Sequence, residues 1–196
     1  MMIKILIRLT FLFFWVLFCS FYPSEKGIQV PGKKLNKTIA KLWKDKELSL
    51  KELESDIAGL CFGNSQLFTV LENKDILGYI YIGRVNSCRS GGCSLDTGDA
   101  AAEFEYFDYF FVTDSQGKVL NVKVYNYRAT HGHEIMSRGW LKQFIGYSGG
   151  EELIYGKDVE AISGATVSAN AINNDIQMEV HCLKKWLSVS AELTIN

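Results

Sequence analysis

The sequence has little that would indicate disorder or attraction to nucleic acid. Only two of its 196 residues are proline and 22% are charged, which argues against a long disordered segment. The formal net charge is -1, so there is no excess of positive charge of the kind that draws a protein to nucleic-acid phosphates. With 47% hydrophobic residues, the chain has the length and composition of one globular domain preceded by a targeting segment.

The N-terminus has the pattern of an export signal. Lys4 and Arg8 precede the run Leu9–Tyr22, which is almost entirely apolar. This run is shorter than the ~20 apolar residues that span a bilayer comfortably, and no pair of small residues marks a cleavage site after it. We therefore expect residues 1–22 to be retained as a membrane anchor, with the positive end inside and the domain exported to the periplasmic side. A lipoprotein acylated at Cys19 and a fully released protein are the second and third alternatives.

The other four cysteines permit three pairings, and thiols outside the cytoplasm tend to be oxidised. Cys88 and Cys93 flank a segment with two glycines, which lets the loop close, so a local disulfide is our favoured interpretation. A redox dithiol is an alternative, although the usual Cys-x-x-Cys spacing is absent, and a zinc site lacks further ligands. Cys61 and Cys182 are interpreted as buried thiols or as a structural pair.

The segment after the apolar run predicts a linker followed by helices. Pro23–Gly32 reads as a linker. Apolar residues at helical spacing then predict two short helices, the first from Lys33 and the second with Ser49 as its N-cap and Glu52 three residues later. Lysines interleaved with these apolar positions are typical of a solvated helix face.

The middle of the chain predicts hairpins and the end predicts a helix. Leu67–Leu71 and Ile76–Val85 flank one short turn, and Phe104–Thr113 and Lys118–Tyr125 flank another. Short turns mean antiparallel pairing, and the aromatic run in the third strand is expected to form the sheet core. We predict an α+β fold: an antiparallel sheet built from hairpins, with flanking helices and a C-terminal amphipathic helix. The apolar stripe of that helix is Ile172, Ile176, Val180, Leu183 and Leu187.

Small and hydroxylic residues precede this final helix. A helix N-terminus presents unpaired N–H groups and a partial positive charge, which attract phosphate. Gly164 and Ala165 allow the backbone to approach a ligand closely, and Thr166 adds a hydroxyl. On these residues alone, an ordinary capped helix entry is the commoner interpretation and a phosphate cradle the alternative.

The stretch Asp158–Ser168 resembles the flavinylation motif of the FMN-binding domain family. That family includes the covalent-FMN subunits of the sodium-translocating NADH:quinone oxidoreductase and of Rnf-type complexes. Its motif is an acidic residue, two variable residues, Ser or Thr, then Gly-Ala-Thr, and the last Thr forms a phosphoester with FMN that a flavin transferase installs outside the cytoplasm. Glu160 stands where the family usually has Asp. The matching positions are Ser163, Gly164, Ala165 and Thr166.

A second segment, Ala129–Ile135, is similar to a Glu-Thr-Pro-Gly-Leu-Gly-like segment of the same family. Thr130 and Gly132 match, whereas the intervening His131 departs from the pattern. The resemblance implies flavin contacts from these three residues and from Trp140 in the aromatic stretch that follows. A metal pair formed by the two histidines of this segment is the alternative, but further ligands are missing.

The resemblance divides the chain into residues 1–22 as signal or anchor, 23–62 as linker and helical segment, and 63–196 as an FMN-binding domain of a single-domain subgroup. It implies an extracytoplasmic electron carrier with FMN on Thr166, rather than a stand-alone oxidoreductase. Its partners would be a flavin transferase, redox donor and acceptor proteins or a membrane complex, the membrane itself, and no nucleic acid. A cofactor-free binding module of the same fold and a flavin-dependent reductase of a small acceptor are the alternatives.

Overall fold

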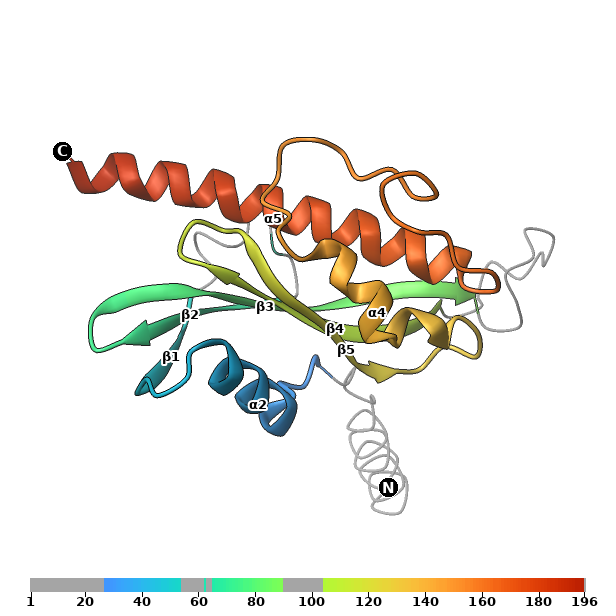
Figure 1. Cartoon of the computed structure of the whole chain (residues 1–196), viewed down its shortest axis with the longest axis horizontal. Coiled ribbons are helices and arrows are strands. Elements are labelled where there is room, and N and C mark those ends of the chain that lie inside the picture. Colours follow the sequence, from blue (N-terminus) through green and yellow to red (C-terminus); the bar gives the residue numbers. More distant parts are fainter. Residues whose placement is uncertain (1–26, 54–61, 63–64, 90–103, 196) are drawn as a thin grey trace, which may run out of the picture.

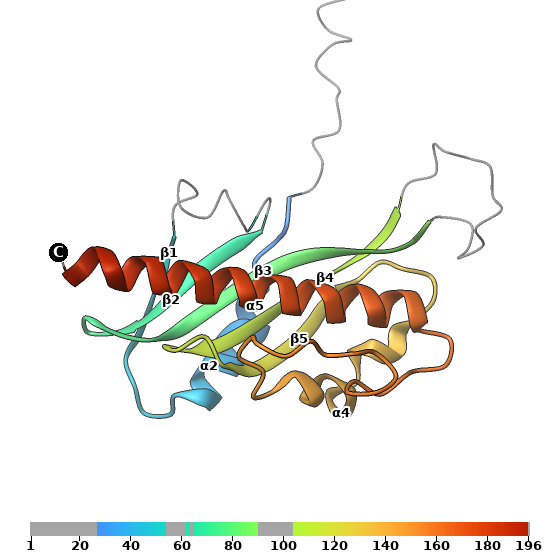
Figure 2. The same ribbon diagram turned by 90° about the horizontal axis from the view of Figure 1, so that it is seen from above.

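The protein is a three-layer arrangement of helix, sheet and helix in the computed structural model, which describes residues 27–53, 62, 65–89 and 104–195 (Figure 1). A five-stranded antiparallel sheet forms the middle layer. Helix α2 covers one face of the sheet and the long helix α5 covers the other, as the second view also shows (Figure 2). The predicted α+β class is confirmed.

The strands follow one another across the sheet in the order β1-β2-β3-β4-β5. Each pair of neighbours in this order is antiparallel, as the predicted hairpins require. Short turns explain this topology: Asn73 has a φ of 57° between β2 and β3, and Gly117 has a φ of 79° between β4 and β5. The strand bounds are Leu48–Glu52 (β1), Gln66–Glu72 (β2), Asp75–Arg89 (β3), Phe104–Asp114 (β4) and Val119–Tyr127 (β5).

The second predicted helix is wrong over its first half, because Leu48–Glu52 is the edge strand β1. Leu48 pairs with Glu72 and Glu52 pairs with Phe68 of β2. The leucines that suggested helical spacing are also compatible with an extended strand. As a strand, the segment forms backbone hydrogen bonds with the open edge of β2, whereas a helix this short is only marginally stable by itself. The remainder of the predicted helix, residues 54–57, lies outside the described residues.

Helix α2, Gly32–Leu42, confirms the first predicted helix. It buries Leu35 and Ile39 against one face of the sheet. The fully buried residues that the sheet contributes to this smaller core are aliphatic except for one phenylalanine: Val70, Ile80, Ile82, Phe110 and Val112.

Helix α5, Thr166–Ile195, confirms the predicted C-terminal helix. Four of the five predicted stripe residues are fully buried and Leu187 is partly buried. Alternation along β4 sends Phe107, Tyr109 and Phe111 to this face and Phe110 to the other. The aromatic run from Phe107 onward is therefore core on both faces of the sheet, whereas Phe104 is exposed and Tyr106 is partly buried.

Short helical turns and a long loop connect β5 to α5. The turns are η1 (His133–Met136), α4 (Arg138–Leu141) and η2 (Lys142–Phe144). Trp140, Leu141 and Phe144 bury this connection against the α5 face of the sheet. None of the helices in the described ranges is long and apolar enough to cross a membrane. The predicted anchor, residues 1–22, lies outside the described residues.

Cys88 and Cys182 each form a disulfide bond. They are not bonded to each other. Ser87 is hydrogen-bonded to Ser168, and Cys182 is 14 residues further along α5, about 21 Å along a helix, whereas bonded cysteines have Cα atoms within about 7 Å. The chain therefore has two separate disulfides, and Cys182 belongs to a pair rather than being a free thiol. Cys61 and Cys93 lie outside the described residues, so the Cys88–Cys93 disulfide stays a prediction.

Candidate functional site

Thr166 is the first residue of α5, and its side chain is exposed. Ser163 and Gly164 before it are also exposed, while Ala165 is buried against the core. Gly164 has a φ of 80°, and nothing lies within 4 Å of the position that a Cβ would take there. The backbone thus turns sharply into the helix, and the space beside Gly164, two residues before Thr166, is open.

The electrostatics of this helix start favour an anion. The first turn of α5 contains no acidic residue, so no carboxylate of that turn competes for its N–H groups. Those N–H groups have no partner within the helix and carry the positive end of the helix dipole. Thr166 therefore sets a hydroxyl at a position where a phosphate group is stabilised.

The loop before Thr166 is held in place by three side chains. The indole N–H of Trp140 donates to the carbonyl of Glu160 over 2.7 Å, and the amide oxygen of Gln143 accepts from the N–H of Glu160, also over 2.7 Å. Tyr155 accepts from the N–H of Ile162 over 2.9 Å. Glu160 is thus fixed through its backbone, and the residue as a whole is exposed.

A cluster of hydroxyl groups lies beneath the first turn of α5. The oxygen of Ser168 lies 2.6 Å from that of Ser87, at the end of β3, and 3.0 Å from the hydroxyl of Tyr127, at the end of β5. Tyr127 also donates to the carbonyl of His131 over 2.5 Å. The cluster ties two strands and the second predicted segment to the helix that begins at Thr166.

Gly132 is required where this second segment passes the helix. It is buried with a φ of 89°, and an added Cβ would lie 2.7 Å from the Ser168 oxygen and 2.8 Å from the Tyr127 oxygen. A side chain here would push the loop away from α5. The two segments that suggested a single site in the sequence are therefore neighbours in the structure.

The other predicted residues of the second segment lie at the surface beside this cluster. Thr130 donates from its N–H and its hydroxyl to the Glu105 carboxylate, and these hydrogen bonds lower the pKa of Glu105. His131 is exposed, as is His133, whose ring lies 4.5 Å from that of Tyr127. No group of metal-binding side chains forms within the described ranges.

Trp140, which the resemblance gives as a flavin contact, is mostly buried, and its contact with the flavin stays a prediction. It is only 5% exposed, and its ring meets that of Phe144 edge to face at 5.4 Å. In this structure the residue supports the loop that carries the motif, through its bond to Glu160. The cluster of Ser87, Ser168 and Tyr127 could not be predicted, because nothing in the spacing of these residues shows that two strand ends meet one helix start.

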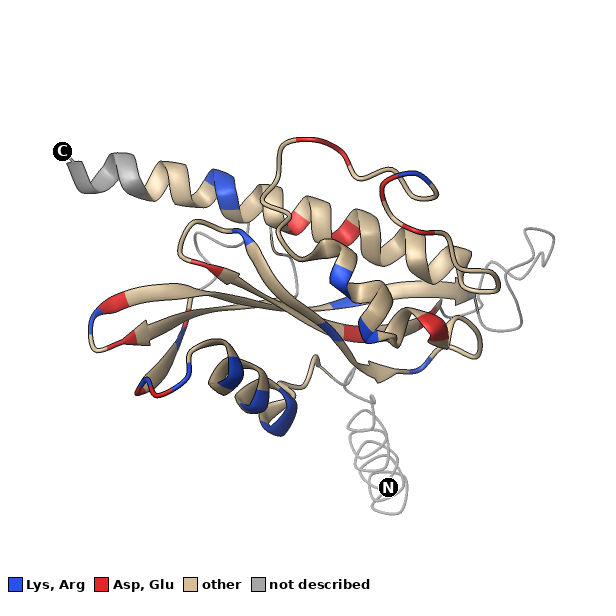
Figure 3. Ribbon diagram, viewed as in Figure 1, with Lys and Arg blue, Asp and Glu red and all other residues tan. Residues whose placement is uncertain are grey.

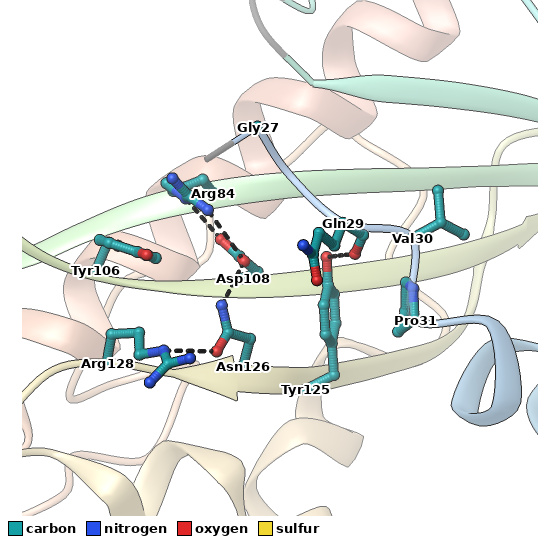
Figure 4. A pocket seen from close by; sticks show the side chains of 10 residues that line it. All are labelled: Gly27, Gln29, Val30, Pro31, Arg84, Tyr106, Asp108, Tyr125, Asn126 and Arg128. Atoms are coloured by element: carbon teal, nitrogen blue, oxygen red, sulfur yellow. Dashed lines mark hydrogen bonds and ion pairs between the residues drawn. The ribbon is translucent and has the colours of Figure 1, made fainter. Parts of the chain in front are cut away.

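A cavity of about 290 Å³ lies on the opposite face of the sheet, beside α2 (Figure 4). Its central group is the buried carboxylate of Asp108, which accepts from the Nε of Arg84 over 2.7 Å and from the amide of Asn126 over 2.7 Å. The Arg84 guanidinium also lies 3.8 Å from the centre of the Tyr106 ring, and its hydrogen bond to Asp108 raises the pKa of Arg84. These contacts link β3, β4 and β5, so we interpret the network as structural.

Comparison with known proteins agrees with the geometry at the start of α5. Residues 108–178 match the model of a family described as the FMN-binding domain. The matched range runs from β4 into α5 and contains both predicted segments, including Thr130 and Thr166. No curated protein matches the chain. The match to the FMN-binding domain at residues 108–178 agrees with the family that the two sequence segments resemble.

Proposed function

We propose that the chain carries FMN covalently, as a phosphoester on the Thr166 hydroxyl, and that it relays electrons outside the cytoplasm. The observation that carries the proposal is the exposed hydroxyl of Thr166 at the first residue of α5, inside the range that matches the FMN-binding domain. The motif residues before it and the absence of acid in the first turn support the same assignment.

The residues present fit a phosphate ester. An ester consumes the Thr166 hydroxyl, and the N–H groups of the first turn stabilise the remaining phosphate charge. Gly164 leaves open space beside the attachment point. FMN supplies the redox chemistry when bound, and the chain holds and orients it.

Export and membrane attachment belong to the same proposal. The basic and apolar pattern of residues 1–22 supports an anchor, and the two disulfides that contain Cys88 and Cys182 are typical of an oxidising compartment. Maturation would require a flavin transferase in that compartment. The electron donor and acceptor would be proteins or a membrane complex on the same side.

The test is to produce the chain together with a flavin transferase and to look for flavin fluorescence at its position on a denaturing gel. We expect fluorescence for the wild type and a complete loss for Thr166→Ala. Val167→Ala is the matched control, because Val167 is also exposed in the first turn but has no hydroxyl, and it should keep the signal. Fluorescence that survives Thr166→Ala would contradict the assignment, and a wild type that never acquires flavin would favour a cofactor-free module.

A further inference from the structure

Helix α2 carries positive charge alone. Its four charged residues are all lysines, with no acidic residue between Gly32 and Leu42. The lysines are exposed, and those at positions 33, 37 and 41 recur at intervals of four, on the side away from the buried Leu35 and Ile39. Figure 3 shows this helix as the most concentrated run of blue in the molecule.

The positive charge continues onto neighbouring elements. Burial lowers the pKa of Lys123 on the edge strand β5, and repulsion from Arg138, Lys34 and Lys37 lowers it further. Among the described residues, no acidic side chain opposes this lowering of the Lys123 pKa. We define the basic patch as Lys33, Lys34, Lys37, Lys41, Lys123 and Arg138.

No carboxylate neutralises this patch within the part of the chain that the structure describes. The two ion pairs there join Lys46 to Glu72 and Arg84 to Asp108, and neither includes a residue of the patch. Lys34 donates to a neutral backbone carbonyl, that of Tyr125, over 3.0 Å. Because the whole chain has a net charge of -1, the patch is a local concentration of charge and not a reflection of the composition.

We infer that the basic patch binds the headgroups of anionic phospholipids in the membrane to which the chain is anchored. The inference rests on the proposed membrane anchor. Helix α2 begins ten residues after the apolar run ends at Tyr22, so even a fully extended linker holds the patch within about 35 Å of the bilayer. The negative surface potential of a membrane attracts cations only within about 10 Å, and a tether of this length allows the lysines to come that close.

This contact would orient the domain. The sheet lies between α2 and α5 (Figures 1 and 2), so a domain resting on α2 presents α5 and Thr166 on the side away from the lipid. Electron partners would then reach the flavin from the aqueous side.

Residue-level amine acylation tests the inference on the full chain. The chain is reconstituted into nanodiscs of phosphatidylcholine alone or of phosphatidylcholine with phosphatidylglycerol, and each lysine's rate of reaction with a membrane-impermeant acylating reagent is read by mass spectrometry. In anionic discs at low salt we expect Lys33, Lys37 and Lys41 to react at least roughly threefold more slowly than in neutral discs, and we expect high salt to abolish the difference. Lys157 and Lys185, both exposed on the α5 side, are internal controls whose rates should not change.

A triple variant sharpens the result. With Lys33→Gln, Lys37→Gln and Lys41→Gln together, the lipid-dependent protection of Lys34 and Lys123 should disappear. If the lysines of the patch were acylated at the same rate in neutral and in anionic discs, whether fast or slow, the proposed contact with anionic lipid would be overturned. The proposed anchor would be unaffected by that result. A chain that does not co-purify with either disc would contradict the anchor and the contact together, and neither result would affect the assignment of FMN to Thr166.

Discussion

The two faces of the sheet are built for different purposes. On the α5 face, aromatic side chains, close helix contacts and a hydroxyl cluster fix the backbone around one helix start, at Thr166. On the α2 face, a smaller aliphatic core leaves a polar cavity and a row of exposed lysines. The difference suits the two roles that we propose: covalent attachment at Thr166 needs an accurately placed backbone, whereas contact with a lipid surface depends less on the position of individual atoms.

The two faces also differ in how their buried carboxyl groups are paired. Asp175 accepts from the Tyr109 hydroxyl over 2.7 Å, and one turn later Glu179 is only 3% exposed. One carboxyl oxygen of Glu179 has no hydrogen-bond partner, and burial, with the charge of Asp175, raises the pKa of Glu179 to about 8. By contrast, the buried Asp108 on the other face is paired with Arg84.

The largest expected effect on the free energy of unfolding comes from truncating one isoleucine on each of the two helices that cover the sheet. Ile176→Ala removes a fully buried side chain from α5 and should lower the free energy of unfolding by roughly 3–4 kcal/mol, because the rigid core cannot close the cavity. Ile39→Ala on α2, where the side chain is 7% exposed, should cost about 2 kcal/mol. Denaturant unfolding measures both values, and in-gel fluorescence should show less flavin only on the Ile176 variant. Equal costs and equal flavin would contradict the distinction between the faces.

Adding one methyl group at Gly132 tests the close contact at the site itself. Gly132→Ala should lower the free energy of unfolding by about 2 kcal/mol more than Gly156→Ala. Both glycines have a positive φ. An added Cβ would collide with Ser168 and Tyr127 at Gly132, whereas it would find open space at Gly156. The difference between the two variants therefore isolates the contact from the backbone strain. If Gly156→Ala proved as costly, the close packing of the two segments would not be the cause.

Neutralising Glu179 should have the smallest effect, and that effect should depend on pH. The folded pKa of about 8 lies above the ordinary value of 4.5, so the native state holds a proton that the unfolded chain releases. Stability is then greatest below about pH 4.5 and falls as the pH rises toward 8. Glu179→Gln, which mimics the protonated form, should flatten this fall and stabilise the protein by roughly 1–2 kcal/mol at pH 8. Urea unfolding from pH 5 to 8 measures the slope, and an unchanged slope would show that Glu179 is not protonated in the native state.

Local signals in the sequence were sufficient for most of the fold. Turn residues between apolar runs predicted the hairpins, and the apolar period of α5 predicted its buried stripe, because both patterns depend on neighbours in the sequence. The strand β1 was missed because five residues with two leucines are compatible with either a helix or an edge strand. Its pairing with β2, which the local pattern does not contain, decides between them.

The site was predictable in part, for a similar reason. Ser163 to Thr166 could be found as a motif, since the hydroxyl and the small residues are consecutive. The meeting of Ser87, Tyr127 and Ser168 could not, because it depends on where three distant elements end. The predicted contact of Trp140 with the flavin stays a prediction, and its burial and its bond to Glu160 could not be predicted, because they are set by packing between distant segments.

The central claim is that FMN is joined to Thr166, and peptide mass spectrometry of the matured protein tests it most directly. We expect the peptide containing Thr166 to be heavier by the mass of FMN minus one water, and we expect fragmentation to place this addition on Thr166. The same peptide from Thr166→Ala should carry no addition. Unmodified Thr166 in protein that a flavin transferase has processed, or FMN on a different residue, would contradict the claim.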